Sequence, residues 1–460
     1  MIAANRAEYG DVYETMRFVT PFEAEAAEKE RRELLALLRE HASTCCLETK
    51  WHTGPLSPGC LCCVRGGWSC LFINNLCNGT CFYCPTPQIS RSEPATNNLS
   101  FPNPKEYCNY VNHFNFRGVS ISGGEPLMTL ERTLEYLNAV RRKCDPGLHL
   151  WMYTNGILLT AEKVRMLRDA GLNELRFDIS ANGYRLDRLE LAAGHIPTVT
   201  VEIPAIPGDY RLLRDLLPSL ADAGVAHLNL HQLRCTPHNR AALVERGYTF
   251  LHGPRVTVLE SELTALRLLT DSLRGGGRSP AINYCSFAYK NRFQAGAARR
   301  RAAEQLVAPH EDITAAGYIR SLALREGGES PRLAAALEQA GDPCRHQAGK
   351  EGRLRCNKAC LALPETMDAA LSVSYSLPGL RNSVSYTGTF RKIMLSRSRA
   401  IYAERRTIIS GREIVAAERD DFLALLHDAG QDNPPSPGDA GRLRDVILHE
   451  QPEPGLSSYF

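Results

Sequence analysis

The chain has 460 residues, of which 43% are hydrophobic, enough for one large core with appendages or for two to three modest domains. Its 54 basic and 51 acidic residues leave a net charge of +3, so bulk charge gives no signal for a nucleic-acid or anionic-membrane partner. Neither a signal-peptide core nor an apolar run of about 18 residues occurs, so we expect a cytoplasmic protein with no membrane partner.

The first 68 residues indicate a helix followed by a cysteine-bearing loop. Residues 22–42 have the spacing of an amphipathic helix, and the stretch 51–67 is rich in glycine and proline. Nine of the 16 cysteines fall between residues 45 and 84. In a reducing compartment, thiols at such short spacing favour metal or redox chemistry over structural disulfides.

From residue 69 onward, short β-rich runs alternate with helical patterns. The expected strands are 70–73, 118–121, 148–153, 174–179, 199–203 and 227–231. The expected helices are 104–115, 129–143, 160–170, 184–192, 210–224 and 258–274. This alternation implies parallel strands joined by right-handed crossovers. Six such units predict an α/β fold in the form of a partial (β/α)6 TIM-type barrel.

The composition predicts three regions. Residues 1–68 form a helical, cysteine-rich N-terminal extension, and residues 69–305 form the barrel core. Residues 306–460 form a small α+β accessory region, with helix indicated over 306–370 and strand over 371–460. The cysteines of this last region, Cys344, Cys356 and Cys360, are candidates for a further metal site.

A cysteine triplet follows the first expected strand, in the sequence CNGTCFYCP. Cys77, Cys81 and Cys84 lie on one tight loop at the carboxyl end of that strand. Three thiolates can hold three irons of a 4Fe-4S cube and leave the fourth iron open. The alternative is a zinc knuckle or a set of free thiols, but structural zinc requires four closed ligands and no further Cys or His follows directly.

The triplet resembles the signature loop of the radical S-adenosylmethionine (SAM) superfamily, including the aromatic Tyr83 before the last cysteine. Two further segments support the resemblance. Gly123-Gly124-Glu125-Pro126 is similar to the family's GGEP motif, which implies that its backbone and Glu125 receive the methionine amino group of SAM. Thr154-Asn155 resembles the family's strand end near the SAM ribose or carboxylate.

The resemblance covers residues 69–235 and implies a 4Fe-4S cluster and SAM as cofactors, with SAM across the carboxyl ends of the strands. Polar residues at those ends then face the same mouth of the barrel. We expect additional SAM contacts from Ser180 and Glu202, and a substrate or radical-site contact from His231. A solvated or hydrogen-bonded bystander role is the alternative for each.

Cysteines outside the triplet leave a second metal site open. Cys60 and Cys63 form a CxxC pair and are the expected ligands of a second iron–sulfur cluster or a zinc ion. Free thiols are the alternative. Cys235 and Cys285 are isolated, and either one could bind a thiophilic substrate or supply a hydrogen atom.

The expected function is reductive cleavage of SAM to a 5′-deoxyadenosyl radical that acts on a small-molecule or peptide substrate. Transfer of the 3-amino-3-carboxypropyl group of SAM to a nucleophilic or thiophilic acceptor is the alternative within the superfamily. A non-catalytic cysteine-rich zinc or iron–sulfur scaffold or sensor is the alternative outside it. The enzyme interpretation further predicts a reductase or flavodoxin-type electron donor.

Overall fold

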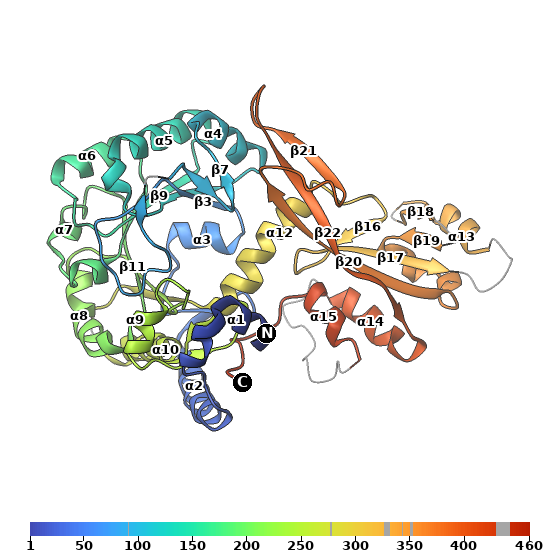
Figure 1. The fold of residues 1–460 in the computed structure, drawn as a ribbon, viewed down its shortest axis with the longest axis horizontal. Helices are drawn as coiled ribbons and strands as arrows, with labels where there is room; N and C mark the ends of the chain where they lie inside the picture. Colours follow the sequence, from blue (N-terminus) through green and yellow to red (C-terminus); the bar gives the residue numbers. More distant parts are fainter. Residues whose placement is uncertain (91, 277, 326–331, 343, 350–352, 429–441) are drawn as a thin grey trace. The chain divides into compact units, whose positions relative to one another are not determined.

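The computed structural model describes the chain except for residues 91, 277, 326–331, 343, 350–352 and 429–441. Two compact units make up the described chain (Figure 1). Unit 1 comprises Met1–Thr96, Ser100–Asn291 and Gly455–Phe460, and unit 2 comprises Asn97–Leu99 and Arg292–Pro454. The three regions 1–68, 69–305 and 306–460 stay predictions, and the division into units falls 14 residues before the second of their boundaries.

Seven parallel strands form the centre of unit 1. They are β3 (Trp68–Phe72), β8 (Gly118–Ser122), β9 (His149–Thr154), β10 (Glu174–Phe177), β11 (Thr198–Pro204), β12 (His227–His231) and β15 (Ala281–Cys285). Neighbours along the sheet follow chain order from β3 to β15, as successive right-handed crossovers require. The α/β partial barrel expected from the sequence is confirmed, and it carries one parallel strand more than the six expected.

Short antiparallel strands extend the sheet at both edges. β1 (Ser43–Cys45) and β2 (Lys50–His52) lie beyond β15, and β6 (Ala95–Thr96) and β7 (Leu99–Ser100) lie beyond β3. The eleven strands therefore run as one open, curved sheet (Figure 1). The cysteine-rich N-terminal segment is thus part of the barrel wall, since β2 pairs directly with β15.

Helices line the outer side of this sheet (Figure 1). They are α4 (Pro104–His113), α5 (Leu130–Lys143), α6 (Ala161–Asp169), α7 (Asp187–Glu190), α8 (Tyr210–Asp222) and α10 (Leu259–Arg274). Local chemistry fixes where several begin: Asn103 and Thr160 accept hydrogen bonds from backbone N–H groups in the first turns of α4 and α6. The outward-facing strand residues that these helices cover are apolar, such as Leu175, Val201 and Leu228, all fully buried.

One short helix, α3 (Pro58–Val64), lies on the inner side of the sheet (Figure 1). It packs against β3, β8 and β9. A side chain at Gly59 would fall 2.3 Å from Arg176 and 3.2 Å from Trp151, so only glycine allows this approach. The cysteines of α3 are therefore placed inside the barrel.

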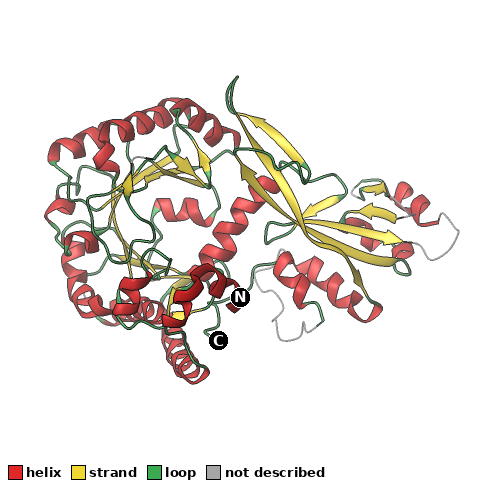
Figure 2. Cartoon of the chain, in the orientation of Figure 1, coloured by secondary structure: helices red, strands yellow, loops and turns green. Residues whose placement is uncertain are grey.

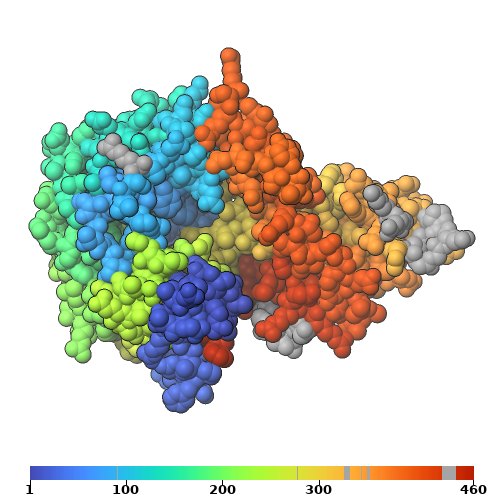
Figure 3. All heavy atoms as spheres, in the orientation of Figure 1, coloured from blue at the N-terminus to red at the C-terminus, as the bar shows by residue number. Residues whose placement is uncertain are grey.

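The N-terminal helices pack on the flank of the barrel. α1 (Ile2–Tyr9) and the 3-10 turn that follows it bury Tyr9 and Tyr13 in one apolar cluster with Phe250. Figure 3 shows the dark-blue N-terminal segment beside the yellow-green segment around residue 250. α2 (Pro21–His41), which begins at a capping box formed by Thr20 and Glu23, packs on α10. The expected helix 22–42 is confirmed.

Unit 2 is built on an antiparallel sheet with helices packed on it (Figure 2). Its strands are β16 (Glu311–Ile313), β17 (Ile319–Arg325), β18 (His346–Ala348), β19 (Arg353–Cys356), β20 (Ala370–Arg381), β21 (Phe390–Met394) and β22 (Ala400–Ile414). Its helices are α12 (Ala295–Ala303), α13 (Arg332–Ala340), α14 (Ala416–Asp428) and α15 (Arg444–Glu450). The expectation of a helical segment 306–370 is wrong for β16, β17 and β19, which are strands. These strands are short, so the sequence pattern did not distinguish them from helix.

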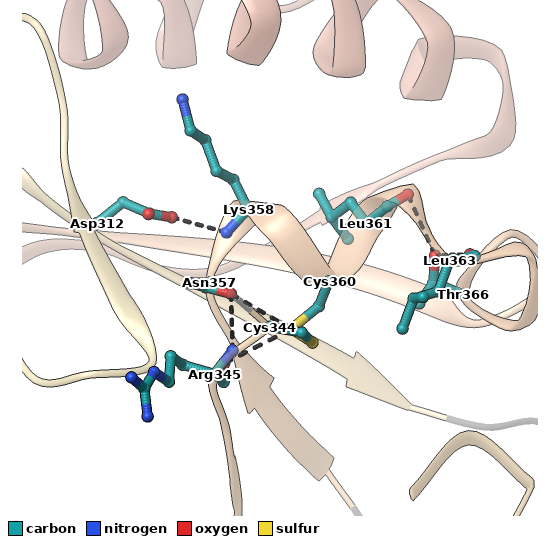
Figure 4. The surroundings of a disulfide bond; sticks show 9 residues. All are labelled: Asp312, Cys344, Arg345, Asn357, Lys358, Cys360, Leu361, Leu363 and Thr366. Atoms are coloured by element: carbon teal, nitrogen blue, oxygen red, sulfur yellow. Dashed lines mark hydrogen bonds between the residues drawn. A yellow bond between two sulfur atoms is a disulfide. The ribbon is translucent and has the colours of Figure 1, made fainter. Parts of the chain in front are cut away.

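A disulfide joins two of the cysteines proposed for a metal site in this region (Figure 4). Cys344 bonds Cys360, and the Asn357 side chain ties the same loop to the backbone N–H of Arg345. Cys356 is fully buried as a free thiol in the apolar core of unit 2. A metal site on these three thiols is therefore not formed in this structure.

Candidate active site

The cysteine triplet lies in a hairpin loop that follows β3. Strand β4 (Asn75–Leu76) pairs with β5 (Ile89–Ser90), and Cys77 N–H donates to the carbonyl of Gln88, so both ends of the loop are anchored. Within the loop, Cys84 N–H donates to the Cys81 carbonyl. We call residues 77–84 the cluster loop. Its position after a barrel strand is the one expected from the sequence.

Two thiols of the cluster loop, those of Cys77 and Cys81, lie beside Gly79, and the third, that of Cys84, donates to the carbonyl of Thr86 at 3.1 Å. A Cβ atom at Gly79 would lie 3.5 Å from the sulfurs of both Cys77 and Cys81, and 3.6 Å from Nδ2 of Asn155. Burial, opposed by one hydrogen bond with Tyr83, raises the pKa of the Cys81 thiol to about 11, and the charge of Asp178 adds to this effect. The Cys81 thiol must therefore lose its proton when it becomes an iron ligand.

N–H donors point at the sulfur of Cys77. The backbone N–H of Gly79 lies 3.3 Å from this sulfur, and the Asn155 amide nitrogen lies 3.7 Å from it. Asn155 also donates to Oδ1 of Asn78 at 2.9 Å. Hydrogen bonds to ligand sulfurs are a feature of iron–sulfur sites. Three thiols on one loop, with donors directed at sulfur, fit a cube ligated at three irons.

Tyr83 fastens the cluster loop to the barrel. Its hydroxyl donates to Asp178 at 2.9 Å and lies 2.6 Å from Oγ of Ser180. Its backbone carbonyl accepts from Asn239 at 2.9 Å. Burial raises the pKa of Tyr83 above its usual value, with the Asp178 charge acting in the same direction. Tyr83, Ser180 and Asp178 thus bond one another in this structure, and the expected contacts of Tyr83 and Ser180 with SAM stay predictions.

The Gly-Gly-Glu segment runs directly alongside β4. Gly124 N–H donates to the Asn74 carbonyl and Glu125 N–H donates to the Leu76 carbonyl. A Cβ at Gly124 would lie 2.0 Å from the carbonyl oxygen of Leu76, and Gly123 has φ of +130°. Both glycines are therefore required for this close approach of two backbones.

The carboxylate of Glu125 clamps the end of β9. It accepts from the Thr154 hydroxyl at 2.9 Å, from Asn155 N–H at 2.7 Å and from Leu127 N–H at 2.9 Å. Glu125 is only 1% exposed, and burial outweighs these hydrogen bonds and raises its pKa to about 7. Glu125 and Thr154 therefore hold Asn155 in place against Cys77, and the Glu125 carboxylate is occupied by this chain's own donors.

A row of charged side chains crosses the interior of the barrel. Arg176 bridges Glu174, at 2.8 Å, and Glu202, at 2.5 Å, and Glu202 in turn bonds Nε2 of His231. Lys290 Nζ lies 2.8 Å from Nδ1 of His231. Although burial opposes it, the Arg176 and His231 charges lower the pKa of Glu202. Glu202 and His231 thus lie in the interior of the barrel and bond each other there, and their contacts with SAM or a substrate stay predictions.

Sequence reasoning did not assign Arg176 or Lys50 to the barrel interior, and it considered Lys290 only as part of the segment 283–290, which could close over the barrel mouth and bind an anionic group. For Arg176 a signal existed, because Glu174 and Arg176 alternate with apolar residues in a strand. Lys50 belongs to a strand only three residues long, and Lys290 begins a π-helical turn, so no periodic pattern places either residue.

Cys60 and Cys63, the expected ligands of a second metal site, face different partners. The Cys60 thiol is buried, donates to Oδ1 of Asn229 at 3.5 Å and lies 3.8 Å from Nδ2 of Asn283. The Cys63 sulfur lies 3.2 Å from the Tyr289 hydroxyl. Joint binding of one metal centre by Cys60 and Cys63 stays a prediction. The separate partners of the two thiols do not favour it.

Among the described residues, no three His, Cys, Asp or Glu side chains converge to hold one metal ion. A single ion draws its ligands to one point, whereas the thiolates of a cube bind separate irons. Within the same residues, no helix is long and apolar enough to cross a membrane. A cytoplasmic location stays a prediction.

Residues 71–190 match the family model of the radical SAM superfamily. These residues of the chain therefore form a radical SAM domain. The chain is accordingly a radical SAM enzyme, whose superfamily uses a 4Fe-4S cluster and SAM, and the matched range contains the cluster loop and the Glu125 clamp. The resemblance stated from the sequence is confirmed, together with these cofactors.

Curated relatives of this radical SAM chain fall into two groups. A protein of Methanocaldococcus jannaschii, provisionally named a glycyl-radical enzyme activating enzyme, is 29% identical over 279 residues, which cover 57% of this chain and 72% of that protein. A GTP 3′,8-cyclase of Campylobacter fetus subsp. fetus is 31% identical over 123 residues, covering 27% of this chain and 35% of that enzyme.

Solved structures similar to this chain include coproporphyrinogen III oxidase of Escherichia coli, titled a radical SAM enzyme, at 12% identity and a TM-score of 0.30. That match covers 52% of this chain and 61% of the oxidase. The radical SAM methyltransferase TsrM of Kitasatospora setae matches at 15% identity and a TM-score of 0.29, over 38% of each chain. The chain thus spans less than two thirds of either structure.

Proposed function

We propose that this radical SAM enzyme cleaves SAM reductively and directs the resulting radical at a substrate held in the polar chamber of the barrel. Cys77, Cys81 and Cys84 would hold the cube. When bound, the reduced cluster supplies an electron that breaks a carbon–sulfur bond of SAM and yields methionine and a 5′-deoxyadenosyl radical. The observation that carries the proposal is the placement of the Cys77 and Cys81 thiols beside Gly79, with Asn155 directed at Cys77 by the Glu125 clamp.

Residues of the chain hold the cluster loop in place and line the barrel interior with polar groups. Tyr83 and Asp178 fix the cluster loop to the end of β10, and Asn155 donates toward Cys77. Backbone groups of Gly123 and Gly124, with Ser180, line the same rim and are the proposed SAM contacts. Glu202 and His231 lie deeper in the chamber, where a substrate would meet them.

A glycine residue of a partner protein is the substrate class that the Methanocaldococcus relative supports, since its name describes activation of glycyl-radical enzymes. The alignment covers 72% of that relative, so it includes most of the relative's length. A small molecule is the alternative substrate, and a flavodoxin-type reductase is the proposed electron donor. Transfer of the aminocarboxypropyl group of SAM is the competing reaction.

The product formed from SAM distinguishes these reactions. The protein is reconstituted anaerobically with iron and sulfide and reduced with dithionite in the presence of SAM, and the products are quantified by liquid chromatography and mass spectrometry. We expect 5′-deoxyadenosine and methionine. Methylthioadenosine in their place would establish the aminocarboxypropyl reaction, and a colourless protein with one tightly bound zinc ion and no SAM products would establish the scaffold alternative.

A further inference from the structure

A second group of thiols lies in the barrel, away from the cluster loop. Strand pairing places Cys45 opposite Lys50 and Lys50 opposite Cys285, so these three residues form one row across β1, β2 and β15. The same register places His231 next to Cys285. Side chains directly opposite each other on neighbouring strands point to the same face. All of this row therefore points into the barrel.

The orientation follows from the residues that alternate with the row. Trp51 faces outward, where its ring meets Arg39 of α2, and Tyr284 faces outward, where its hydroxyl bonds Glu262 of α10. Because alternate strand residues point to opposite faces, Lys50 and Cys285 must face inward. The inner helix α3 presents Cys63 to the same space, since Cys63 and Lys50 both contact the Tyr289 side chain.

Lys50 is an unusual residue to bury in such a place. It is 1% exposed, and its ammonium nitrogen lies 4.6 Å from the centre of the Tyr289 ring. The ionisable groups that act on its charge are thiols, those of Cys285, Cys60, Cys63 and Cys45. A buried ammonium group needs a negative partner, and the neighbouring thiols can provide one when they are deprotonated.

The backbone that carries the second thiol of this group is strained. Cys46, Leu47 and Glu48 have φ values of 55°, 53° and 58°, a left-handed conformation that such residues rarely adopt and almost never in succession. The turn places the Cys46 thiol within hydrogen-bonding reach of Cys45 and near Cys63. Strained backbone of this kind occurs where a function requires it.

We propose a second iron–sulfur cluster in unit 1, with ligands Cys45, Cys46, Cys63 and Cys285. We call these four residues the Lys50 thiol group. Four thiolates close a 4Fe-4S cube, which then carries a net negative charge, and the ammonium of Lys50, a residue paired with both Cys45 and Cys285, supplies the compensating cation beside it. Lys290, which lies near Cys285 and Cys63, adds a second one.

Cys60 is not a ligand in this arrangement. Its thiol faces Asn229 and Asn283 on the strands, so the CxxC pair expected from the sequence contributes only Cys63. The second cluster would face the chamber that Glu202 and His231 line, since His231 is the neighbour of Cys285. It could there exchange an electron with a substrate. The inference does not require SAM cleavage.

Iron content separates the two clusters. After anaerobic reconstitution, we expect about eight irons and eight sulfides per chain in the wild type. The triple variant C77A/C81A/C84A should retain about four irons, a brown colour and an EPR signal after reduction that SAM does not perturb. The double variant C63A/C285A should also retain about four irons, with a signal that SAM does perturb.

The control is Cys62→Ala, because Cys62 lies next to Cys63 on α3 but bonds the Arg117 carbonyl. It should keep about eight irons. Cys46→Ala, in the left-handed turn after β1, is the second test of the group should C63A/C285A fail to fold, and it should lower the iron content in the same way. A wild type with about four irons, a colourless triple variant, or one zinc beside four irons would overturn the second cluster. SAM cleavage by such a four-iron wild type would leave the proposed function standing.

Discussion

The cluster loop and the Lys50 thiol group present sulfur to the same barrel, but they are built in different ways. The cluster loop takes its three thiols from eight consecutive residues, and neighbouring strands only orient it. The Lys50 thiol group draws its members from β1, the left-handed turn after it, α3 and β15, over 241 residues of chain. A contiguous site can be recognised from spacing alone, whereas an assembled site depends on strand register.

The largest expected effect is on the rate of SAM cleavage, and it distinguishes the cysteines of the cluster loop from the other cysteines in the barrel. Cys81→Ala should lower the rate of SAM cleavage by at least about 1,000-fold, because the cube loses one of its three ligands. The rate is measured as 5′-deoxyadenosine formed per minute by the reconstituted protein. Cys62→Ala, a half-buried thiol on α3, is the matched control and should keep its rate. Retained cleavage in the Cys81 variant would refute the ligand assignment.

The Glu125 clamp should make stability depend on pH. Burial raises the Glu125 pKa to about 7, above its ordinary value of 4.5, so the folded state holds a proton that the unfolded state releases. Stability is therefore lost as the pH rises from about 4.5 to about 7, by up to about 3 kcal/mol.

Urea unfolding of the metal-free protein at several pH values measures this effect. Glu125→Gln, which cannot ionise, should show a flatter profile over the same range. Equal slopes for the wild type and the variant would show that Glu125 does not titrate as the structure implies. Asp178→Asn provides a second comparison, since burial raises the pKa of Asp178 as well.

A smaller effect is expected where the cluster loop meets the strand. Tyr83→Phe removes the hydroxyl that donates to the buried Asp178 carboxylate and should cost about 1–3 kcal/mol of stability. The loop should also hold its cluster less firmly, which is measured as faster iron loss to a chelator. Tyr248→Phe, a half-buried tyrosine elsewhere in unit 1, is the control. Unchanged iron loss in the Tyr83 variant would mean that the loop does not depend on this contact.

The smallest expected effect tests which cysteines belong to the Lys50 thiol group. Cys60→Ala should leave the iron content unchanged and cost about 1 kcal/mol of stability, because its thiol only packs against two amides. Cys63→Ala, three residues along the chain, should lower the iron content of the protein by about four irons. The iron-to-protein ratio of the two variants, measured side by side, decides between them. Equal iron loss would restore the CxxC pair as a metal-binding unit.

Much of unit 1 is predictable from sequence because its signals are local. The six expected strands and the cysteine triplet each lie within a few consecutive residues. Strand β15 was not predicted, since Ala281–Cys285 contains Asn283 and Cys285 facing inward and resembles no apolar run. Alternation with apolar residues indicates the inward position of Arg176, but its pairing with Glu202 depends on the register of β10 and β11.

The roles of site residues were less predictable than their positions. Glu125 lies where the GGEP resemblance implies, but its carboxylate is taken up by Thr154 and Asn155 rather than left open to a ligand. A motif specifies which residues lie close together, but it does not specify which hydrogen-bond donors bind them. Lys50 shows the same limit, since nothing in a three-residue strand indicates a buried ammonium.

The EPR spectrum of the reduced cluster, recorded with and without SAM, tests the central assignment most directly. The C63A/C285A variant is used, so that only the cluster loop contributes a signal. We predict a 4Fe-4S signal that changes on addition of SAM, since an iron without a protein ligand is open to the amino and carboxylate groups of methionine. A 4Fe-4S signal that SAM leaves unchanged would contradict it.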